Sequence, residues 1–133
     1  MVSIIAGEKG KGKTKILIEK ANEAISKAEG SVMYLDKSSK HMYELNNRIR
    51  LVNVSEFPII SADGFLGFIS GLISSDHDIE KIFLDSFLKL AVLEGVDITS
   101  TIDRLETLGE KYGITFVLSI SMDASALPEN AKK

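Results

Sequence analysis

The sequence predicts an α/β fold, with five parallel strands in one sheet and helices on both of its faces. Apolar, strand-like segments alternate with segments whose apolar residues recur at helical spacing, which is typical of parallel sheets. The strand segments are almost continuously apolar, as strands buried on both sides are. A glycine-rich loop joins the first strand to the first helix. We therefore expect a single three-layer α/β/α domain covering residues 1–133.

The first two strands flank an amphipathic helix. Residues 2–6 are short and apolar and are expected to form a buried strand. Residues 13–28 carry apolar side chains one helical turn apart, which predicts a helix. Gly30 then stands where a glycine that ends a helix would be expected. Residues 31–36 form a second apolar strand, which ends in a carboxylate.

The middle of the chain carries weaker signals. Residues 38–45 are expected to form a short helix, and residues 50–54 a third strand. Residues 62–74 place large apolar side chains on one face, which predicts a longer helix. The small residues of that helix, Gly64, Gly67 and Gly71, fall on one side of it. We expect them to allow close packing on the sheet, with a contact between two copies of the chain as the alternative.

The last part of the chain supplies two more strands and the helices beside them. These elements are expected at residues 81–85 (strand), 86–93 (helix), 100–112 (helix) and 114–120 (strand). Ser100 and Asp103 resemble a capping box at the start of the longer helix, and Gly113 is expected to end it. The polar tail after residue 120 is expected to be irregular and to dock through Leu127 and Pro128.

The composition describes a globular chain without a dominant electrostatic partner. Hydrophobic residues make up 44% and charged residues 26% of the 133 residues. The net charge of -3 argues against a nucleic-acid footprint, so nucleic acid is not indicated. The chain has no cysteine, which excludes disulfides and thiolate metal sites. It has no signal-peptide pattern and no apolar run that could span a bilayer, so we expect a cytoplasmic protein.

Residues 7–14 match the phosphate-binding pattern G-x-x-x-x-G-K-[ST] at every fixed position. Its glycines let the backbone take positive φ and approach a ligand closely, and successive amide N–H groups at a helix N-terminus then bind an anion. We expect Lys13 to reach the β- and γ-phosphates and Thr14 to ligate Mg²⁺. The expected phosphate-binding residues are Gly7, Glu8, Lys9, Gly10, Lys11, Gly12, Lys13 and Thr14.

Polar residues follow the strands at their carboxyl ends, where parallel sheets bind ligands. Asp85 ends an apolar strand, a pattern that holds Mg²⁺ in P-loop proteins, directly or through water; capping the next helix is the alternative. Asp36 is a candidate base for activating water, and a cap or turn role is equally supported. Ser119 is expected either to contact a γ-phosphate or simply to end its strand. The candidate catalytic residues are thus Lys13, Asp36 and Ser119, and the metal ligands Thr14 and Asp85.

This order of motifs resembles the RecA-like branch of the P-loop NTPases over about residues 1–121. After the P-loop, the resemblance rests on the segments Tyr34-Leu35-Asp36, Phe83-Leu84-Asp85-Ser86 and Val117-Leu118-Ser119. It implies that strand 114–120 lies between strands 2–6 and 81–85. The chain departs from many members of the branch at Ser86, where they carry a glutamate. It is also similar to short, stand-alone ATP-binding proteins of Gram-positive bacteria, some of which carry a loose twitching-motility-ATPase label.

The sequence therefore predicts a protein that binds ATP, or another nucleoside triphosphate, together with Mg²⁺. We expect a weak or partner-stimulated ATPase or a nucleotide switch, which acts with a protein partner or through self-association. A small-molecule or nucleoside kinase and a non-hydrolysing ATP-binding module are the alternatives. Kinases favour positive side chains over the transferred group, and this chain has only Arg48, Arg50 and Arg104 and no long lid insertion.

Overall fold

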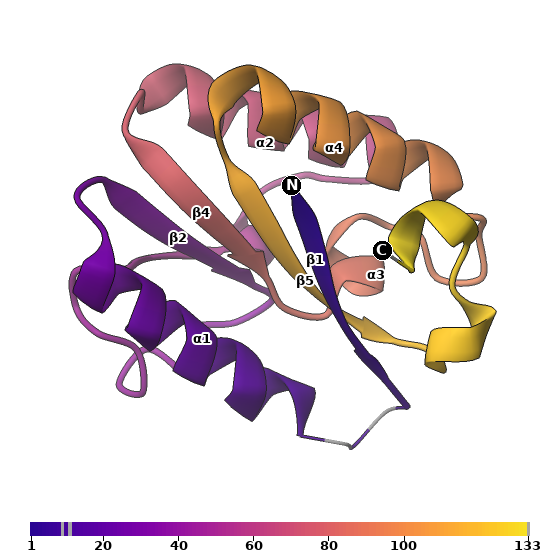
Figure 1. Cartoon of the computed structure of the whole chain (residues 1–133), viewed down its shortest axis with the longest axis horizontal. Helices are drawn as coiled ribbons and strands as arrows, with labels where there is room; N and C mark the ends of the chain where they lie inside the picture. The colour runs from indigo at the N-terminus through magenta and orange to yellow at the C-terminus, as the bar shows by residue number, and fades with distance from the viewer. Residues whose placement is uncertain (9, 11, 133) are drawn as a thin grey trace.

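The protein is an α/β structure built on one five-stranded parallel sheet (Figure 1). The structure is a computed structural model that describes residues 1–8, 10 and 12–132. Its strands are β1 (Val2–Gly7), β2 (Ser31–Asp36), β3 (Arg50–Asn53), β4 (Ile79–Leu84) and β5 (Thr115–Ser121). Its helices are α1 (Lys13–Lys27), α2 (Ala62–Ser75), α3 (Phe87–Leu90) and α4 (Thr99–Tyr112), with 3₁₀ turns η1 (Val54–Glu56), η2 (Ala124–Ala126) and η3 (Glu129–Ala131).

The strand order is β1-β5-β4-β2-β3, and every neighbouring pair is parallel. β5 lies between β1 and β4, as the sequence predicted. The register sets Ile5 beside Ser119, and Leu84 beside Leu118. Because all strands run the same way, the loop after β1 and the residues after β4 meet at one edge of the sheet.

The two faces of the sheet are covered differently (Figure 1). α2 and α4 lie on one face, over a core that includes Met33, Ile82 and Phe116. α1 lies on the other face, where Leu17 and its apolar neighbours pack against side chains of β2, β4 and β5. Leu45, from the segment after β2, joins this second core. One helix and the segment that carries Leu45 therefore cover this face of the sheet. Leu17→Ala in this core would lower the free energy of unfolding by about 2–5 kcal/mol.

The prediction of a short helix at residues 38–45 is wrong, because this segment forms successive turns. Its backbone makes turn hydrogen bonds, such as the one from the Glu44 N–H to the His41 carbonyl at 3.0 Å, and it is also bound by a side chain of α1. Asn22 donates from Nδ2 to the carbonyl of Glu44 at 2.9 Å and accepts from the N–H of Asn46 at 2.8 Å. Such side-chain bonds compete directly with helical ones.

The helix expected at residues 86–93 shrinks to the four residues of α3. Ser86 before it and Val92 after it have φ of 55° and 59°, in the left-handed region that L-residues rarely adopt. These two positions stop the helix at both ends. The chain is therefore folded tightly around the residues that follow β4.

The predicted start of α4 is also corrected. The helix begins at Thr99, and Asp97 rather than Ser100 accepts the Thr99 N–H, at 3.0 Å. Asp103 binds the tail instead, accepting from Asn130 Nδ2 at 2.8 Å. Gly113 ends the helix with φ of 68°, as predicted. Leu127 is buried against the core, so the tail docks where the sequence indicated.

Two predictions about glycines are wrong: the glycines of α2 do not pack on the sheet, and Gly30 does not cap α1. Gly64, Gly67 and Gly71 are exposed, and a Cβ at Gly67 or Gly71 would meet no atom within 4 Å, so they do not pack on the sheet. A Cβ at Gly30 would lie 2.0 Å from the Asp78 carbonyl oxygen. Gly30 therefore permits two loops to touch and does not cap α1, which ends in an extended Ala28. Within residues 1–8, 10 and 12–132, no helix is long and apolar enough to cross a membrane.

Candidate functional site

Two glycines of the sequence motif, Gly10 and Gly12, lie between β1 and α1 and border open space. Gly10 and Gly12 have φ of 86° and 74°, and a Cβ on either would meet no atom within 4 Å. Only glycine combines this conformation with close approach of a ligand. Gly7 does not have the positive φ that was expected of it, because it is the last residue of β1 and pairs with Ser121. Lys9 and Lys11, which the sequence also assigned to the loop, lie outside the described residues.

The N-terminus of α1 opens at this loop. Gly12 is the N-cap and supplies no side chain to the first amide groups, and the first turn carries no acidic residue. Those amides have no carbonyl partner within the helix and carry partial positive charge. Lys13 donates from Nζ to the carbonyl of Glu8 at 2.9 Å. The loop thus holds its own lysine at the start of a helix suited to an anion.

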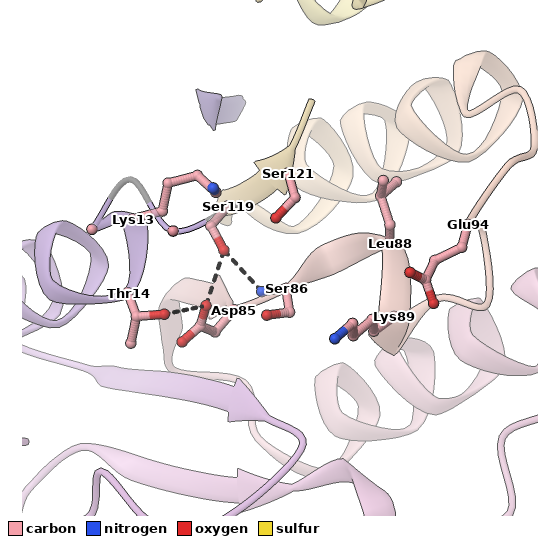
Figure 2. Close-up of a pocket in the computed structure, with 11 residues that line it drawn as sticks. Lys13, Thr14, Asp85, Ser86, Leu88, Lys89, Glu94, Ser119 and Ser121 are labelled. Carbon is pink, nitrogen blue, oxygen red and sulfur yellow. Dashed lines mark hydrogen bonds between the residues drawn. The ribbon is translucent and has the colours of Figure 1, made fainter. Parts of the chain in front are cut away.

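Three side chains converge at the carboxyl edge of the sheet, as Figure 2 shows. Thr14 Oγ1 donates to Asp85 Oδ1 at 3.1 Å, and Ser119 Oγ donates to the same oxygen at 3.0 Å. Thr14 belongs to α1, Asp85 follows β4, and Ser119 belongs to β5. The fold therefore brings together two predicted metal ligands and one predicted catalytic residue. Asp85 does not cap α3, whose N-cap is Ser86.

The second oxygen of Asp85 accepts a hydrogen bond from Tyr34, a residue that the sequence did not identify as part of the site. Tyr34 Oη donates to Asp85 Oδ2 at 2.8 Å, and the Tyr34 side chain is 0% exposed. Burial, and next the charge of Asp85, raise the pKa of the Tyr34 phenol far above its ordinary value. The phenol therefore stays protonated and can act here as a permanent hydrogen-bond donor.

Ser119 links the edge of the sheet to the segment after β4. Its hydroxyl donates to Asp85 and accepts the backbone N–H of Ser86 at 2.8 Å. Ser119 is 2% exposed, so both bonds are shielded from water. The left-handed backbone of Ser86 is thereby fixed by a hydroxyl that also orients the carboxylate.

These groups line a cavity of about 380 Å³ at the carboxyl edge. Its lining combines residues of the loop, the strand ends and α3: Gly10, Gly12, Lys13, Thr14, Asp85, Ser86, Leu88, Lys89, Glu94, Ser119 and Ser121. Lys89 and Glu94 lie across the cavity from Lys13 in Figure 2. Sequence reasoning missed both, because they follow a strained segment whose direction no periodicity reveals. A cavity of this volume falls in the range of small-molecule binding pockets.

Asp36, the other candidate catalytic residue, lies apart from this lining. It is 7% exposed, and its Oδ1 accepts the backbone N–H of Lys37 at 2.7 Å, a local turn contact. Its Oδ2 has no hydrogen-bond partner in the described part of the chain. Burial raises the pKa of the Asp36 carboxyl above its ordinary value, against the opposing effect of the Lys37 N–H. Asp36 is therefore a buried carboxyl group outside the cavity lining, and its ionisation is energetically unfavourable in the folded protein.

The oxygens around Asp85 fit a magnesium ion. No group of three or more His, Cys, Asp or Glu side chains that could hold a metal occurs in the described residues, so an all-protein cage is not available there. Mg²⁺ usually takes only one or two protein oxygens, with water and phosphate completing an octahedron. Neighbouring ligands of that octahedron are about 2.9 Å apart, given bonds of 2.0–2.1 Å. Thr14 Oγ1 and Asp85 Oδ1 are separated by a similar 3.1 Å.

Fold and site together define an α/β protein in which a glycine-containing loop and a helix N-terminus border a cavity at the carboxyl edge of a parallel sheet. No protein-family model matches the chain, and no curated protein matches it.

Proposed function

We propose that this protein binds a nucleoside triphosphate, ATP first among them, together with Mg²⁺ in the cavity at the carboxyl edge. The contact between Thr14 and Asp85 carries the proposal, because it joins the helix after the glycine loop to the carboxylate after β4 at 3.1 Å. A chance glycine-lysine turn would have no reason to meet a buried carboxylate 71 residues away. The strand order, with β5 between β1 and β4, supports the RecA-like branch of the P-loop NTPases.

The residues divide the ligand between them. The first amides of α1 and the ammonium of Lys13 would bind the β- and γ-phosphates by charge-assisted bonds. Thr14 and Asp85 would hold Mg²⁺, which neutralises charge on the phosphates when bound. Ser119 lies beside Asp85 and lines the same cavity, so its hydroxyl is available to a terminal phosphate.

The surroundings favour slow hydrolysis or a switch over rapid turnover. Ser86 follows Asp85 where many relatives of the branch carry a glutamate base, and its N–H is engaged by Ser119. Asp36 does not belong to the cavity lining, as far as the structure describes it. Glu94 is the second carboxylate that does line the cavity. A partner or a second copy of the chain would then supply the groups that rapid hydrolysis requires.

A small-molecule kinase is the second candidate, and the strand order counts against it. In the kinase-like branch we expect the strand of the metal carboxylate directly beside the P-loop strand. Here β5 separates β4 from β1. Incubation with Mg²⁺-ATP and chromatography of the products distinguishes the readings: ADP plus phosphate supports the ATPase, and a phosphorylated small molecule supports the kinase. Unchanged ATP that remains bound supports the binding module.

The proposal is tested by removing the loop lysine. Lys13→Ala should weaken ATP binding about 10- to 150-fold, because a hydrogen bond to a charged group contributes about 1.5–3 kcal/mol. Lys20→Ala, on an exposed position of the same helix, is the matched control and should bind as wild type does. Calorimetry that gives the Lys13 variant wild-type affinity would remove the basis of the proposal.

A further inference from the structure

We propose that Tyr34 is a positioning residue for magnesium binding. Its hydroxyl group holds the Asp85 carboxylate so that one defined oxygen faces the cavity. This inference rests on the proposed function, since it concerns the same ion. The two oxygens of Asp85 have separate surroundings: Oδ1 accepts from Thr14 and Ser119, and Oδ2 accepts from Tyr34 at 2.8 Å. Tyr34 itself is absent from the cavity lining. It therefore acts on a ligand through Asp85 alone.

The Tyr34 hydroxyl is fixed by the packing of its ring. The ring is fully buried in the core under α1, and it stacks on Phe83 with centroids 6.4 Å apart and planes inclined by 16°. Tyr34 and Phe83 are also direct partners in the parallel pairing of β2 with β4. A ring held from two sides has one hydroxyl position, so the donor is preorganised before any ligand arrives.

The main chain of Asp85 is held by the same strand. Its N–H donates to the carbonyl of Leu35 at 3.0 Å, which continues the β2–β4 pairing one residue beyond β4. β2 thus binds both the backbone and the side chain of Asp85. The carboxylate is left with little rotational freedom, and its orientation becomes a property of the sheet rather than of the loop that follows.

A buried tyrosine needs a hydrogen-bond partner, and this need alone does not explain the partner it has. Tyr34 donates to Asp85, a carboxylate that lines the cavity and also accepts from Thr14 at the start of α1. Groups that hydrogen-bond a metal ligand orient it, and their loss typically costs 10- to 100-fold in metal affinity or activity. Magnesium dependence is therefore the property that separates a positioning role from a structural one.

The test is Tyr34→Phe, which keeps the ring and removes only the hydroxyl. Binding of a fluorescent ATP analogue is measured with saturating Mg²⁺ and in EDTA. We expect the gain in affinity due to Mg²⁺ to fall about 10-fold or more, with binding in EDTA unchanged. Tyr43→Phe removes a hydroxyl from a side chain that is 92% exposed and should match wild type. A Tyr34 variant with the full wild-type gain overturns the inference.

Two further measurements complete the test. In the Asp85→Asn background, Tyr34→Phe should cost no further Mg²⁺ dependence, because both changes act on one carboxylate; additive losses would contradict this. If the Tyr34 variant does not fold, the wild type decides: Mg²⁺ added to the nucleotide-bound protein should shift the ¹³Cζ resonance of Tyr34 but not that of Tyr43. An unmoved Tyr34 resonance overturns the inference. Wild type that gains nothing from Mg²⁺ would instead overturn the magnesium proposal itself.

Discussion

Asp85→Asn is the substitution whose consequences can be worked out most fully. It removes the negative charge at the cavity while keeping the shape of the side chain. The carboxylate now accepts from three hydroxyl groups, those of Thr14, Ser119 and Tyr34. An amide keeps one accepting oxygen, and the Tyr34 hydroxyl can rotate to accept from its nitrogen. We therefore expect the fold to survive and the magnesium site to fail.

The size of the effect follows from linkage between binding and unfolding. Mg²⁺-ATP at 100 times its dissociation constant stabilises a protein by about 2.7 kcal/mol. A binding loss of about 10- to 100-fold at Asp85 would leave only about 0.4–1.4 kcal/mol at the same concentration. At 2.1 cal/mol/K per residue, a chain of 133 residues changes its Tm by about 3–4 °C per kcal/mol. The ligand-induced rise in Tm should thus fall from about 10 °C to about 1–5 °C.

Thermal unfolding with Mg²⁺-ATP and with ATP in EDTA measures this directly. In EDTA the variant should gain as much stability from ATP as wild type does, or more, because a negative charge beside the phosphates is gone. Asp78→Asn makes the same charge change on an exposed residue at the opposite edge of the sheet and serves as the control. Equal losses with and without Mg²⁺ would refute the reasoning and assign Asp85 a structural role.

Two more predictions concern the groups around the site. Asp36→Asn should make the unliganded protein more stable at neutral pH relative to acid than wild type is, because it removes a carboxyl whose ionisation folding disfavours. Since folding raises the pKa of Asp36, the stability that this group contributes is fully present below about pH 4 and is lost as the pH rises through the folded-state pKa. The difference in stability between the variant and wild type, measured by denaturant unfolding, should therefore change in favour of the variant from acid toward neutral pH. ATP turnover by the purified protein should lie well below ~1 s⁻¹, since none of Arg48, Arg50 and Arg104 is among the described lining residues. The rate per molecule should rise with protein concentration if a second copy supplies an arginine, and fast, concentration-independent hydrolysis would contradict the prediction.

The arginines illustrate what the structure adds to the turnover argument. Arg48 donates to the carbonyl of Ile25 at 3.2 Å, in the last turn of α1. Arg50 pairs with Asp76 at 3.4 Å, at the edge where the strands begin. Arg104 pairs with Asp63 at 2.6 Å, on the side of the sheet that α2 and α4 cover. All three arginines therefore bind groups of their own chain that lie outside the cavity lining.

The sheet could be predicted from the sequence because its signals are local. A short apolar run such as residues 31–36 is recognisable by composition alone, and α1 by its 3.6-residue period. Thr14 and Asp85 were found because each lies at a fixed offset from a motif. Their actual contact depends on the strand order, which the sequence indicated only through its resemblance to a known branch.

The missed features depend on long-range register or on uncommon backbone. Tyr34 read as an ordinary apolar strand residue, and only the pairing of β2 with β4 brings its hydroxyl to Asp85. Lys89 lines the cavity from α3, a short helix that follows the left-handed backbone of Ser86, which no local preference predicts. The segment 38–45 forms turns instead of the expected helix, and Asn22 of the distant α1 binds it at Glu44, a contact that no local pattern reveals.

The position of β1 at one end of the sheet determines when the site can form during synthesis. In the sheet β1 pairs with β5, and its first hydrogen-bonded neighbours, such as Phe116 beside Val2, come more than a hundred residues later. At a ribosomal rate of about 5–20 residues per second, that interval is roughly 6 to 20 s. The glycine loop thus leaves the ribosome early with its strand unpaired, and Ser119 arrives with the same strand that pairs β1. The last strand made both completes the sheet and completes the set of hydroxyl groups around Asp85, so a nascent chain finishes its sheet and its cavity in the same late step.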